Sequence, residues 1–413
     1  MAYLFTRFPH LTETFLQREV LAMKQLGLEP VLFSLHRGGG VFAGTTVRTF
    51  NKWRLLQLFW LAFVECLRGP HALAGVARRL FLTWPRDWIN YWENLYGAGI
   101  GVVLAREIRS GNFQHAHSVW ASLPATTAWV LSRLTGVTFS IGAHAYDLFE
   151  HGGDWLLREK CAASSFVHTS TESGFRRLLA LGVPASKIVL ARRGLLPFPP
   201  CRPLRADRSR LRVLCIARLV EKKGLLRQLA IYDELRARGL AFEVRIVGEG
   251  PMRRRLATEI AARQLDGVVA LAGRKSIDEV WAELAAADVL VHSGVVAGSG
   301  DRDGLPNVVP EAMAAGVLVV TAPCAGVQEA IVHKETGFVC ALDDAGSWRD
   351  AFDRLQNDTV VAERIRQAAR AWTEEHFDAV KNARLVLARF ERVRHERALA
   401  DAPALPPSDD AVV

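Results

Sequence analysis

Short β-rich runs alternate with helical segments along most of the chain, and this alternation constrains the fold more than any other feature. We expect strands at residues 139–141, 165–168, 187–190, 212–217, 242–247, 268–271, 288–292 and 317–321. Strands separated by helices pair in parallel, because each helix returns the chain to the same end of the sheet. The sequence therefore predicts an α/β protein built from doubly wound, Rossmann-like parallel sheets.

The alternation stops between residues 195 and 211, where four prolines lie among four arginines. Proline fixes φ and has no backbone donor, so this segment can form neither a helix nor a central strand. The expected order is an N-terminal domain (1–196), a linker (197–211), a C-terminal domain (212–375), a helix that packs back towards the N-terminal domain (376–398) and a disordered tail (399–413). Two such domains face each other across a cleft, where ligands bind.

Residues 51–92 differ from the rest of the N-terminal domain because they carry many large apolar side chains beside arginines, without regular strand signals. The apolar set is Trp53, Leu55, Leu56, Phe59, Trp60, Phe63, Leu67, Phe81, Trp84, Trp88 and Trp92. We interpret residues 51–110 as a helical excursion. Two roles are open: the helices settle into the interface of an anionic membrane, where Trp and Arg flank an apolar face, or they pack on the sheet as ordinary helices.

Signals for export and membrane insertion are absent from the sequence. Met1 leads into a short strand-like segment, without a basic region followed by an apolar one, so we expect no cleaved signal peptide. The longest apolar stretches fall short of the roughly 18 residues of a spanning helix. The 6 cysteines never approach a C-x-x-C spacing, which argues against structural zinc and for a reducing compartment. We expect a cytoplasmic protein, free or at the cytoplasmic face of the inner membrane.

The net charge of +9 favours anionic partners, which include nucleic acid, phospholipid and phosphorylated small molecules. The basic residues are dispersed, and no recognition helix or stacking platform is evident, so we expect no nucleic-acid partner. Arg218 and Lys223 are placed differently, because they directly follow the expected strand at 212–217. Cations at the carboxyl edge of a parallel sheet suit a doubly anionic diphosphate. The alternative is two surface cations in a loop.

A second candidate element follows downstream, where Asp303-Gly304-Leu305-Pro306-Asn307 leads into a helix containing Glu311. Free amides at the start of a helix suit an anion, and Gly304 permits close approach of the backbone. Asp303 and Glu311 are eight positions apart, which lets both carboxylates accept hydrogen bonds from the hydroxyls of one ligand.

Two patterns that resemble metal sites carry less weight. His115 and His117 would lie on the same side of a strand, but no carboxylate or third histidine stands near them in the sequence, so lining of a pocket is the favoured interpretation. Asp301 and Asp303 form a D-x-D pattern of the kind that can hold a divalent ion on a diphosphate, but Arg302 would compete with that ion. We therefore expect no metal ion at either pattern and no cofactor.

These motifs, in this order, resemble those of the retaining GT-B glycosyltransferases of family 4 type. Residues 218–224 are similar to the family's diphosphate motif, 246–251 to its second nucleotide-proximal loop, and 303–316 to its E-x7-E element. In the first half, residues 6–15, 115–117 and 142–147 resemble the subgroup that builds bacterial exopolysaccharides of the colanic acid type. The resemblance extends over nearly the whole chain.

The resemblance implies transfer of a sugar from a UDP- or GDP-sugar to a saccharide or polyprenyl-linked acceptor, with retention of configuration and no obligatory metal. Arg218 and Lys223 would hold the diphosphate, Glu311 the ribose, Asp303 the donor sugar, and His144 the sugar from the opposite domain. The other substrate-binding positions that it implies are Gly304, Leu305, Pro306, Asn307, Gly248, Glu249, Glu13, Thr14, His117 and Asp147.

One position departs from the family pattern. Asp303 stands where the first glutamate of E-x7-E is usual, which shortens the side chain by one methylene. A second hypothesis of a different class therefore stays open, in which a catalytically impaired protein of the same fold binds sugar nucleotide or polysaccharide. Intact Arg218, Lys223 and Glu311 favour the enzyme.

Overall fold

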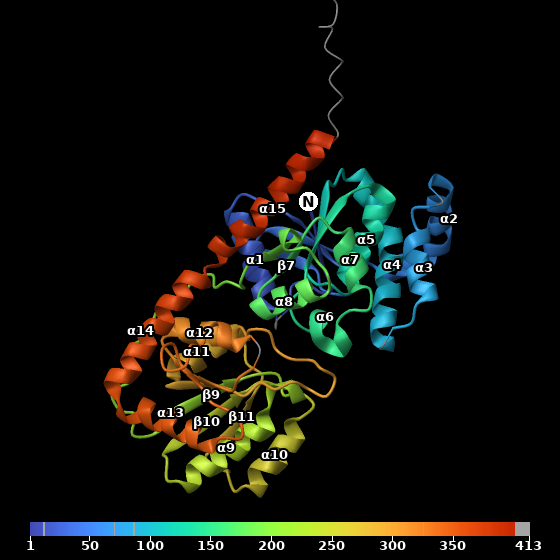
Figure 1. Ribbon diagram of the computed structural model, residues 1–413. Coiled ribbons are helices and arrows are strands. Elements are labelled where there is room, and N and C mark those ends of the chain that lie inside the picture. Colours follow the sequence, from blue (N-terminus) through green and yellow to red (C-terminus); the bar gives the residue numbers. More distant parts are fainter. Residues whose placement is uncertain (11–12, 70, 86, 325, 401–413) are drawn as a thin grey trace, which may run out of the picture.

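The computed structural model describes residues 1–10, 13–69, 71–85, 87–324 and 326–400, and it consists of two α/β domains stacked against each other (Figure 1). The predicted fold class is confirmed, since each domain is built on a mainly parallel sheet. Of the tail expected at 399–413, residues 399–400 belong to the last helix, and the remainder lies outside the described residues.

The sheet of the N-terminal domain has the strand order β3-β4-β2-β1-β5-β6-β7-β8 within the described residues. Its strands are β1 (Ala2–Phe5), β2 (Val31–Ser34), β3 (Gly40–Phe42), β4 (Thr45–Thr49), β5 (His115–Ser118), β6 (Thr138–Gly142), β7 (Val167–Thr169) and β8 (Ile188–Leu190). All neighbours pair in parallel except β3 and β4, which form an antiparallel hairpin at one edge. The hairpin occupies a glycine-rich stretch whose alternation is too short to identify as strand from sequence.

The helices of this domain cover both faces of the sheet, because successive side chains of each strand point to opposite faces. Ala2 and Leu4 pack into one hydrophobic cluster with α4 and α5, whereas Tyr3 and Phe5 pack into another with α1 and α15. The helix bounds are α1 (Thr14–Gln25), α4 (Trp88–Ser110), α5 (Leu123–Thr135), α6 (Tyr146–Phe149), α7 (Leu157–Ala163), α8 (Glu172–Ala180) and α15 (Ala379–Ala400).

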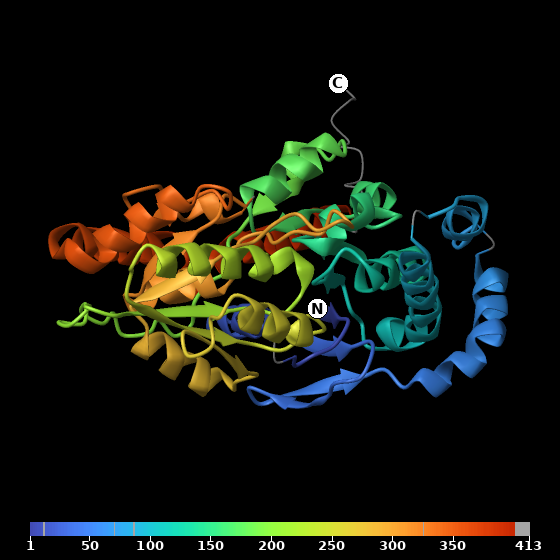
Figure 2. The ribbon, with the colours of Figure 1, turned by 90° about the horizontal axis from the view of Figure 1, so that it is seen from below.

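The predicted excursion is helical and contains a 3₁₀ helix (Lys52–Gln57), α2 (Leu58–Arg68) and α3 (Ala74–Leu82) before α4. Figure 2 shows α2 and α3 on the outer side of the N-terminal domain, far from the C-terminal domain. An ion pair holds α2 to α4, with Arg109 Nη2 at 2.9 Å from Oε2 of the buried Glu65. The helices are thus anchored by one face only, and most of their large apolar side chains point to solvent.

The C-terminal domain has a parallel sheet of order β11-β10-β9-β12-β13-β14. Its strands are β9 (Leu211–Ile216), β10 (Phe242–Val247), β11 (Val269–Gly273), β12 (Val289–His292), β13 (Leu318–Thr321) and β14 (Phe338–Val339). The helices are α9 (Leu225–Ala237), α10 (Arg253–Ala262), α11 (Ile277–Ala286), α12 (Val308–Ala315), α13 (Ala345–Asn357) and α14 (Thr359–His376). Two hydrophobic clusters bury the sheet. One face packs against α9, α10 and α13, and the other against α11, α12 and α14.

The chain passes between the domains twice, and the two passages lie side by side. The Leu195 amide donates to the Phe377 carbonyl at 2.7 Å, and the Ala379 amide donates to the Leu195 carbonyl at 3.4 Å. Gly194 approaches Ala379 so closely that a Cβ at this position would lie 2.0 Å from the Ala379 Cα. After this junction α15 runs along α1, so the end of the described chain lies on the N-terminal domain (Figure 1).

Close packing of α4 on α5 requires glycine at particular positions. A Cβ at Gly101 would lie 2.7 Å from Val130 Cβ, whereas one at Gly99 would meet only the flexible ends of Leu58 and Leu55, at 3.3 and 3.4 Å. Overpacking by one methyl group typically costs about 1–3 kcal/mol, while replacement of a helical glycine by alanine gains about 1 kcal/mol.

We therefore expect Gly101→Ala to lower the free energy of unfolding by up to about 2 kcal/mol, because the overpacking cost exceeds the gain in helix propensity. The matched variant Gly99→Ala should leave that free energy unchanged or raise it. Urea unfolding of the three proteins measures both values, and equal midpoints for the two variants would contradict the packing assignment.

Candidate functional site

The candidate site lies where the carboxyl ends of both sheets meet the cleft. β9 ends at Ile216, and the chain then supplies Arg218 and Lys223 before α9 begins. Gly224 makes this turn with φ +64° and packs so tightly on β12 that a Cβ would lie 1.9 Å from the Ser293 carbonyl oxygen. The turn after β9 is thus pressed against the end of β12, which brings Lys223 to the residues that follow β12.

Asp303 is the point at which these segments converge. Lys223 Nζ lies 2.5 Å from Asp303 Oδ2, and His292 Nε2, at the end of β12, lies 3.2 Å from the same oxygen. Burial alone would raise the pKa of Asp303, but the Lys223 charge and the hydrogen bond from His292 outweigh it and hold the pKa well below its usual range. Asp303 is therefore an anion in contact with a cation expected to hold the diphosphate.

A second ion pair, which the sequence did not single out, lies beside the first. Lys222 is buried, and its Nζ lies 2.8 Å from Asp301 Oδ2 and 3.7 Å from Asp303 Oδ1. The two aspartates of the D-x-D pattern thus face two lysines. Arg218 is exposed, and its charge acts across the cleft on Glu13 and His10 of the N-terminal domain.

The loop after β10 reaches the same sheet edge. A Cβ at Gly248, which has φ +143°, would lie 1.9 Å from the Ala217 carbonyl oxygen, so only glycine allows the two loops to touch. Glu249 accepts a hydrogen bond from Arg253 Nη1 at 2.9 Å. Glycine is therefore required at position 248 for the close contact between the two loops. The Glu249 carboxylate is paired with Arg253 of its own domain.

Glu311 lies in the first turn of α12 and is buried against the other domain. Arg18 of α1 donates to it, with Arg18 Nη2 at 2.8 Å from Glu311 Oε1. Burial raises the pKa of Glu311, and the Arg18 charge opposes that rise. This ion pair joins the two domains across the cleft, and nothing in the sequence linked Arg18 to Glu311.

The loop that leads into α12 contacts the predicted histidine of the opposite domain. A Cβ at Gly304 would lie 3.4 Å from the carbonyl oxygen of His144. Leu305 and Pro306 are buried here, and Asn307 precedes the first residue of α12. Residues 304–307 thus lie at the junction of the domains, as the site requires.

His144 follows β6 and is enclosed by other rings. Its ring centroid lies 5.5 Å from that of Trp120, 5.0 Å from that of His168 and 6.3 Å from that of Phe15. Burial, with smaller contributions from His168 and Arg193, lowers its pKa well below the usual value, so the ring is neutral at pH 7. The side chain is 2% exposed, so in this conformation the ring does not reach the cleft surface where its predicted contact with the donor sugar would be made.

Arg193 is a cation of the site that the sequence did not reveal. It follows β8, and its Cζ stacks 3.6 Å from the centroid of the Phe15 ring. Burial lowers its pKa to about 10, against the attraction of carboxylates that include Asp147, Glu13 and Asp303. The sequence held one signal for it, since Arg192-Arg193 follows the expected strand at 187–190 in the way that Arg218 follows its own.

The structure places Asp147 behind the cleft surface, which corrects its predicted role as a direct contact for substrate. Its carboxylate accepts hydrogen bonds from the amides of Ala121, His144 and Ala145, at 3.0, 3.0 and 2.8 Å. The side chain is 1% exposed. We assign Asp147 to fixing the loop that carries His144.

Three further residues predicted to bind substrate lie in different parts of the structure. Glu13 faces the cleft near Trp120, Arg193 and Arg218, and burial raises its pKa. Thr14 instead lines a different cavity, between α1, the linker and α11. His117 is buried in β5 behind α1, beside Glu19 and His168, so it does not reach the cleft in this conformation.

A cavity of about 860 Å³ extends from the diphosphate end of the site along the N-terminal domain. Arg218, Lys222 and Asp301 line it on one side. Tyr146 and Glu93 also line it, and so do Trp84 and Ile89, which are exposed residues of the helical excursion. Burial and nearby carboxylates raise the pKa of Glu93 to about 6.

Residues 202–372 match the family described as glycosyl transferases group 1. Over 411 residues the chain is 35% identical to the colanic acid biosynthesis glycosyltransferase WcaL of Escherichia coli strain K12, which covers 96% of this chain and 95% of the relative. It is also 35% identical over 203 residues to the amylovoran biosynthesis glycosyltransferase AmsK of Erwinia amylovora, covering 49% of this chain and 50% of that protein.

Solved structures agree on the fold. Sucrose-phosphate synthase of Thermosynechococcus elongatus superposes with a TM-score of 0.71 at 15% identity, covering 97% of this chain and all (100%) of that one. HepE of Anabaena, in complex with UDP and glucose, superposes with a TM-score of 0.68 at 15% identity, covering 95% and 100%. The predicted GT-B fold is confirmed.

The hydrogen bonds that Asp147 accepts from backbone amides predict a contribution to stability. Asp147→Asn replaces an acceptor oxygen by a donor that would face backbone N–H groups, and an unpaired buried group costs about 1–3 kcal/mol. We expect the free energy of unfolding, measured in urea, to fall by about this amount. The exposed Asp266→Asn should leave it within about 0.5 kcal/mol, and equal losses would contradict the assignment.

Proposed function

The chain belongs to the glycosyl transferases group 1 family and is a glycosyltransferase with relatives in exopolysaccharide biosynthesis, and from this premise we propose the finer features of its reaction. The donor is a UDP- or GDP-sugar, the acceptor is a saccharide carried on a polyprenyl lipid, and the configuration at the transferred carbon is retained. The observation that carries this proposal is the convergence of Lys222, Lys223, Asp301 and Asp303 at the sheet edge.

The donor diphosphate binds to protein cations and needs no metal ion. Arg218 offers a fork of N–H donors, and Lys223 supplies a point charge. In the structure Lys223 is paired with Asp303, so a bound diphosphate would share this cation with the carboxylate. Once Lys223 is shared, the Asp303 carboxylate can also accept hydrogen bonds from hydroxyl groups of the donor sugar. Although Asp is shorter than Glu, its carboxylate still reaches Lys223.

Transfer proceeds on the front side of the sugar. The bond between the anomeric carbon and the phosphate oxygen breaks, the acceptor oxygen bonds to that carbon from the same face, and the acceptor proton passes to the departing phosphate oxygen. Arg218 and Lys223 stabilise the charge that develops on the phosphate. Asp303 is already held by Lys223 and His292, which makes it a poor nucleophile for a covalent intermediate.

The acceptor saccharide binds in the cavity of about 860 Å³. Carboxylates and aromatic rings, which line it, are the groups that bind sugar hydroxyls and sugar faces. Glu93, with its pKa near 6, accepts a hydrogen bond from an acceptor hydroxyl in its ionised form. The cavity leads from Arg218 to Trp84, so the lipid end of the acceptor emerges at the exposed helices.

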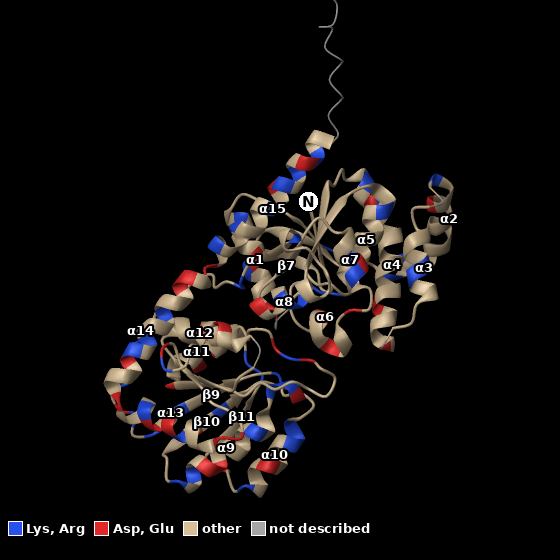
Figure 3. Cartoon of the chain, in the orientation of Figure 1, with Lys and Arg blue, Asp and Glu red and all other residues tan. Residues whose placement is uncertain are grey.

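Those helices form a surface that fits an anionic membrane. The side chains of Phe59 and Trp84 are 87% and 78% exposed, and the exposed apolar set continues through Trp53, Leu56, Trp60, Phe63, Leu67, Phe81, Leu82, Trp88, Ile89 and Trp92. Arg54, Arg68, Arg78 and Arg79 flank it. In Figure 3 most of the segments coloured red for Asp and Glu lie on other elements of the molecule. No helix among the described residues is long and apolar enough to cross a bilayer, so contact would be made at the interface.

The alternative of an impaired binding protein rests on Asp303 alone. The contacts of Asp303 with Lys223 and His292 favour an enzyme, because they give the shorter carboxylate defined partners at the place where the donor sugar is expected. Release of nucleoside diphosphate in the presence of acceptor distinguishes the two functions.

Loss of Lys223 should impair catalysis far more than folding. We expect Lys223→Ala to lower turnover by about 100- to 1,000-fold, which is the usual effect of removing one group that stabilises a developing anion. Release of nucleoside diphosphate measures turnover, and thermal unfolding checks the fold. The control is Lys275→Ala, which removes an ion pair with Glu279 at the start of α11 and should retain activity. Unchanged turnover in Lys223→Ala would refute the assignment.

Membrane contact is tested with vesicles. Trp60→Ser with Phe63→Ser should weaken sedimentation with vesicles of phosphatidylglycerol and phosphatidylcholine by about tenfold or more, since burial of one large apolar side chain is worth about 1.5–3 kcal/mol. Val360→Ser removes an exposed apolar side chain from the C-terminal domain and is the control. Binding that does not depend on phosphatidylglycerol or on the two aromatic residues would contradict the proposed surface.

A further inference from the structure

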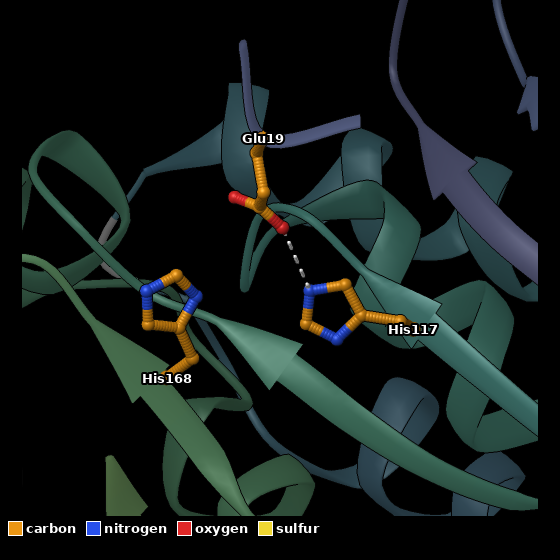
Figure 4. A group of neighbouring side chains, drawn as sticks. All are labelled: Glu19, His117 and His168. Carbon is orange, nitrogen blue, oxygen red and sulfur yellow. Dashed lines mark ion pairs between the residues drawn. The ribbon is translucent and has the colours of Figure 1, made fainter. Parts of the chain in front are cut away.

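Three side chains outside the reaction site converge behind it, each from a different element. Glu19 lies on α1, His117 on β5 and His168 on β7 (Figure 4). Their ligand atoms all lie within 4.8 Å of one another, and Glu19 Oε1 is 3.9 Å from His117 Nε2. Both histidines are buried, and Glu19 is largely sheltered. Nothing in the reaction proposed above uses this group.

The hydrogen bonds of His168 show which of its nitrogens carries the proton. His168 Nε2 lies 3.0 Å from the Ala191 carbonyl oxygen, and a carbonyl only accepts. Nε2 therefore bears the hydrogen, and Nδ1 of the neutral ring has a free lone pair. Nδ1 is buried and has no hydrogen-bond partner among the described residues.

A chain of hydrogen bonds fixes the tautomer of His117 in the same way. The Thr138 hydroxyl donates to the Gln114 carbonyl at 3.1 Å, so it accepts from His115 Nδ1 at 2.7 Å. His115 Nε2 is then an acceptor, and it takes the single hydroxyl proton of Ser140 at 2.8 Å. Ser140 Oγ in turn accepts from His117 Nδ1 at 2.8 Å. The nitrogen left with a lone pair is His117 Nε2, which faces Glu19.

Burial raises the pKa of Glu19 to about 7, and in its ionised form three electron-pair donors point at one place without a hydrogen-bond donor between them. Glu19 Oε1 is also buried without a partner among the described residues. Such an arrangement is unfavourable unless a cation or a donor sits between the atoms. We propose that Glu19, His117 and His168 bind a Zn²⁺ ion that serves the structure of the N-terminal domain.

The chemistry of the group fits this ion. Zn²⁺ takes imidazole nitrogen and carboxylate oxygen at about 2.0–2.2 Å, and each zinc-bound histidine usually donates its other N–H to an outer partner. Ala191 and Ser140 are such partners here. A small cavity of about 30 Å³ lined by Glu19 and His168 offers room for a water molecule as fourth ligand. The ligand atoms lie within 4.8 Å of one another, and a tetrahedral zinc site needs them about 3.3 Å apart, so all three side chains would shift slightly on binding.

The nearby Arg193 does not exclude a cation. Its charge acts on Glu19, but it also interacts with the carboxylates of Asp147, Glu13 and Asp303, so the region carries compensating negative charge. The ion would tie α1 to the sheet at Glu19, one residue from Arg18, which pairs with Glu311 across the cleft. Zinc would therefore steady the helix that makes the contact between domains.

The test uses the full chain, stripped with EDTA and then titrated with Zn²⁺ or with Co²⁺ as a spectroscopic probe. We expect one ion per chain, a rise in Tm with Zn²⁺ concentration because only the folded state binds, and ligand-field absorption of Co²⁺. Glu19→Gln and His168→Gln should each weaken affinity by more than about 100-fold, and Ser140→Ala, which removes an outer partner, by about tenfold. His395→Gln, at an exposed histidine of α15, should bind as the parent does.

Because a variant can lose zinc simply by failing to fold, the zinc ligands are also identified in the unaltered chain. X-ray absorption of the zinc-loaded parent should show two imidazole ligands and oxygen, without sulfur. Sulfur ligation would mean that the cysteines bind the ion and would overturn the proposal. Equal metal content in the parent and the folded Glu19→Gln variant would overturn it too, and so would an unmodified chain that binds no zinc. These readouts do not depend on sugar transfer.

Discussion

Parallel strands deliver the residues that follow them to one edge of their sheet, and both sheets of this protein open that edge towards the same cleft. Lys223 follows β9, Asp303 follows β12, His144 follows β6 and Arg193 follows β8. These residues are far apart in the sequence, but each follows a parallel strand, so the topology brings them to the cleft edge of their sheets. Every contact of the candidate site depends on this arrangement.

Charge in the cleft is balanced locally, although the whole chain carries +9. Lys222 and Lys223 face Asp301 and Asp303, and Arg18 faces Glu311. An incoming diphosphate thus meets cations that already have carboxylate partners. In the proposed reaction, a ligand that offers hydroxyl groups to these carboxylates as well as phosphate to the lysines would bind in preference to a simple anion.

Much of this could be predicted from the sequence, and the limits have physical causes. The alternation of strands and helices predicted the fold class, and the motifs around Arg218 and Asp303 predicted the family, because both depend on local order in the chain. Arg18 and Glu19 could not be predicted as partners of Glu311, His117 or His168, since those contacts join residues about 100 to 300 positions apart. Local sequence patterns do not show which distant residues pair. They also do not show that the apolar face of α2 points to solvent.

The paired passages of the chain between the domains limit how the cleft can open. Leu195 is bonded to Phe377 and Ala379, so the strand that leaves the N-terminal domain and the helix that returns to it form one narrow joint. The Arg18–Glu311 ion pair joins the domains as well, and if it breaks the domains stay tethered at this joint. Rotation about the joint would change the separation of the domains least near Gly194 and most at the end of the cleft farthest from it.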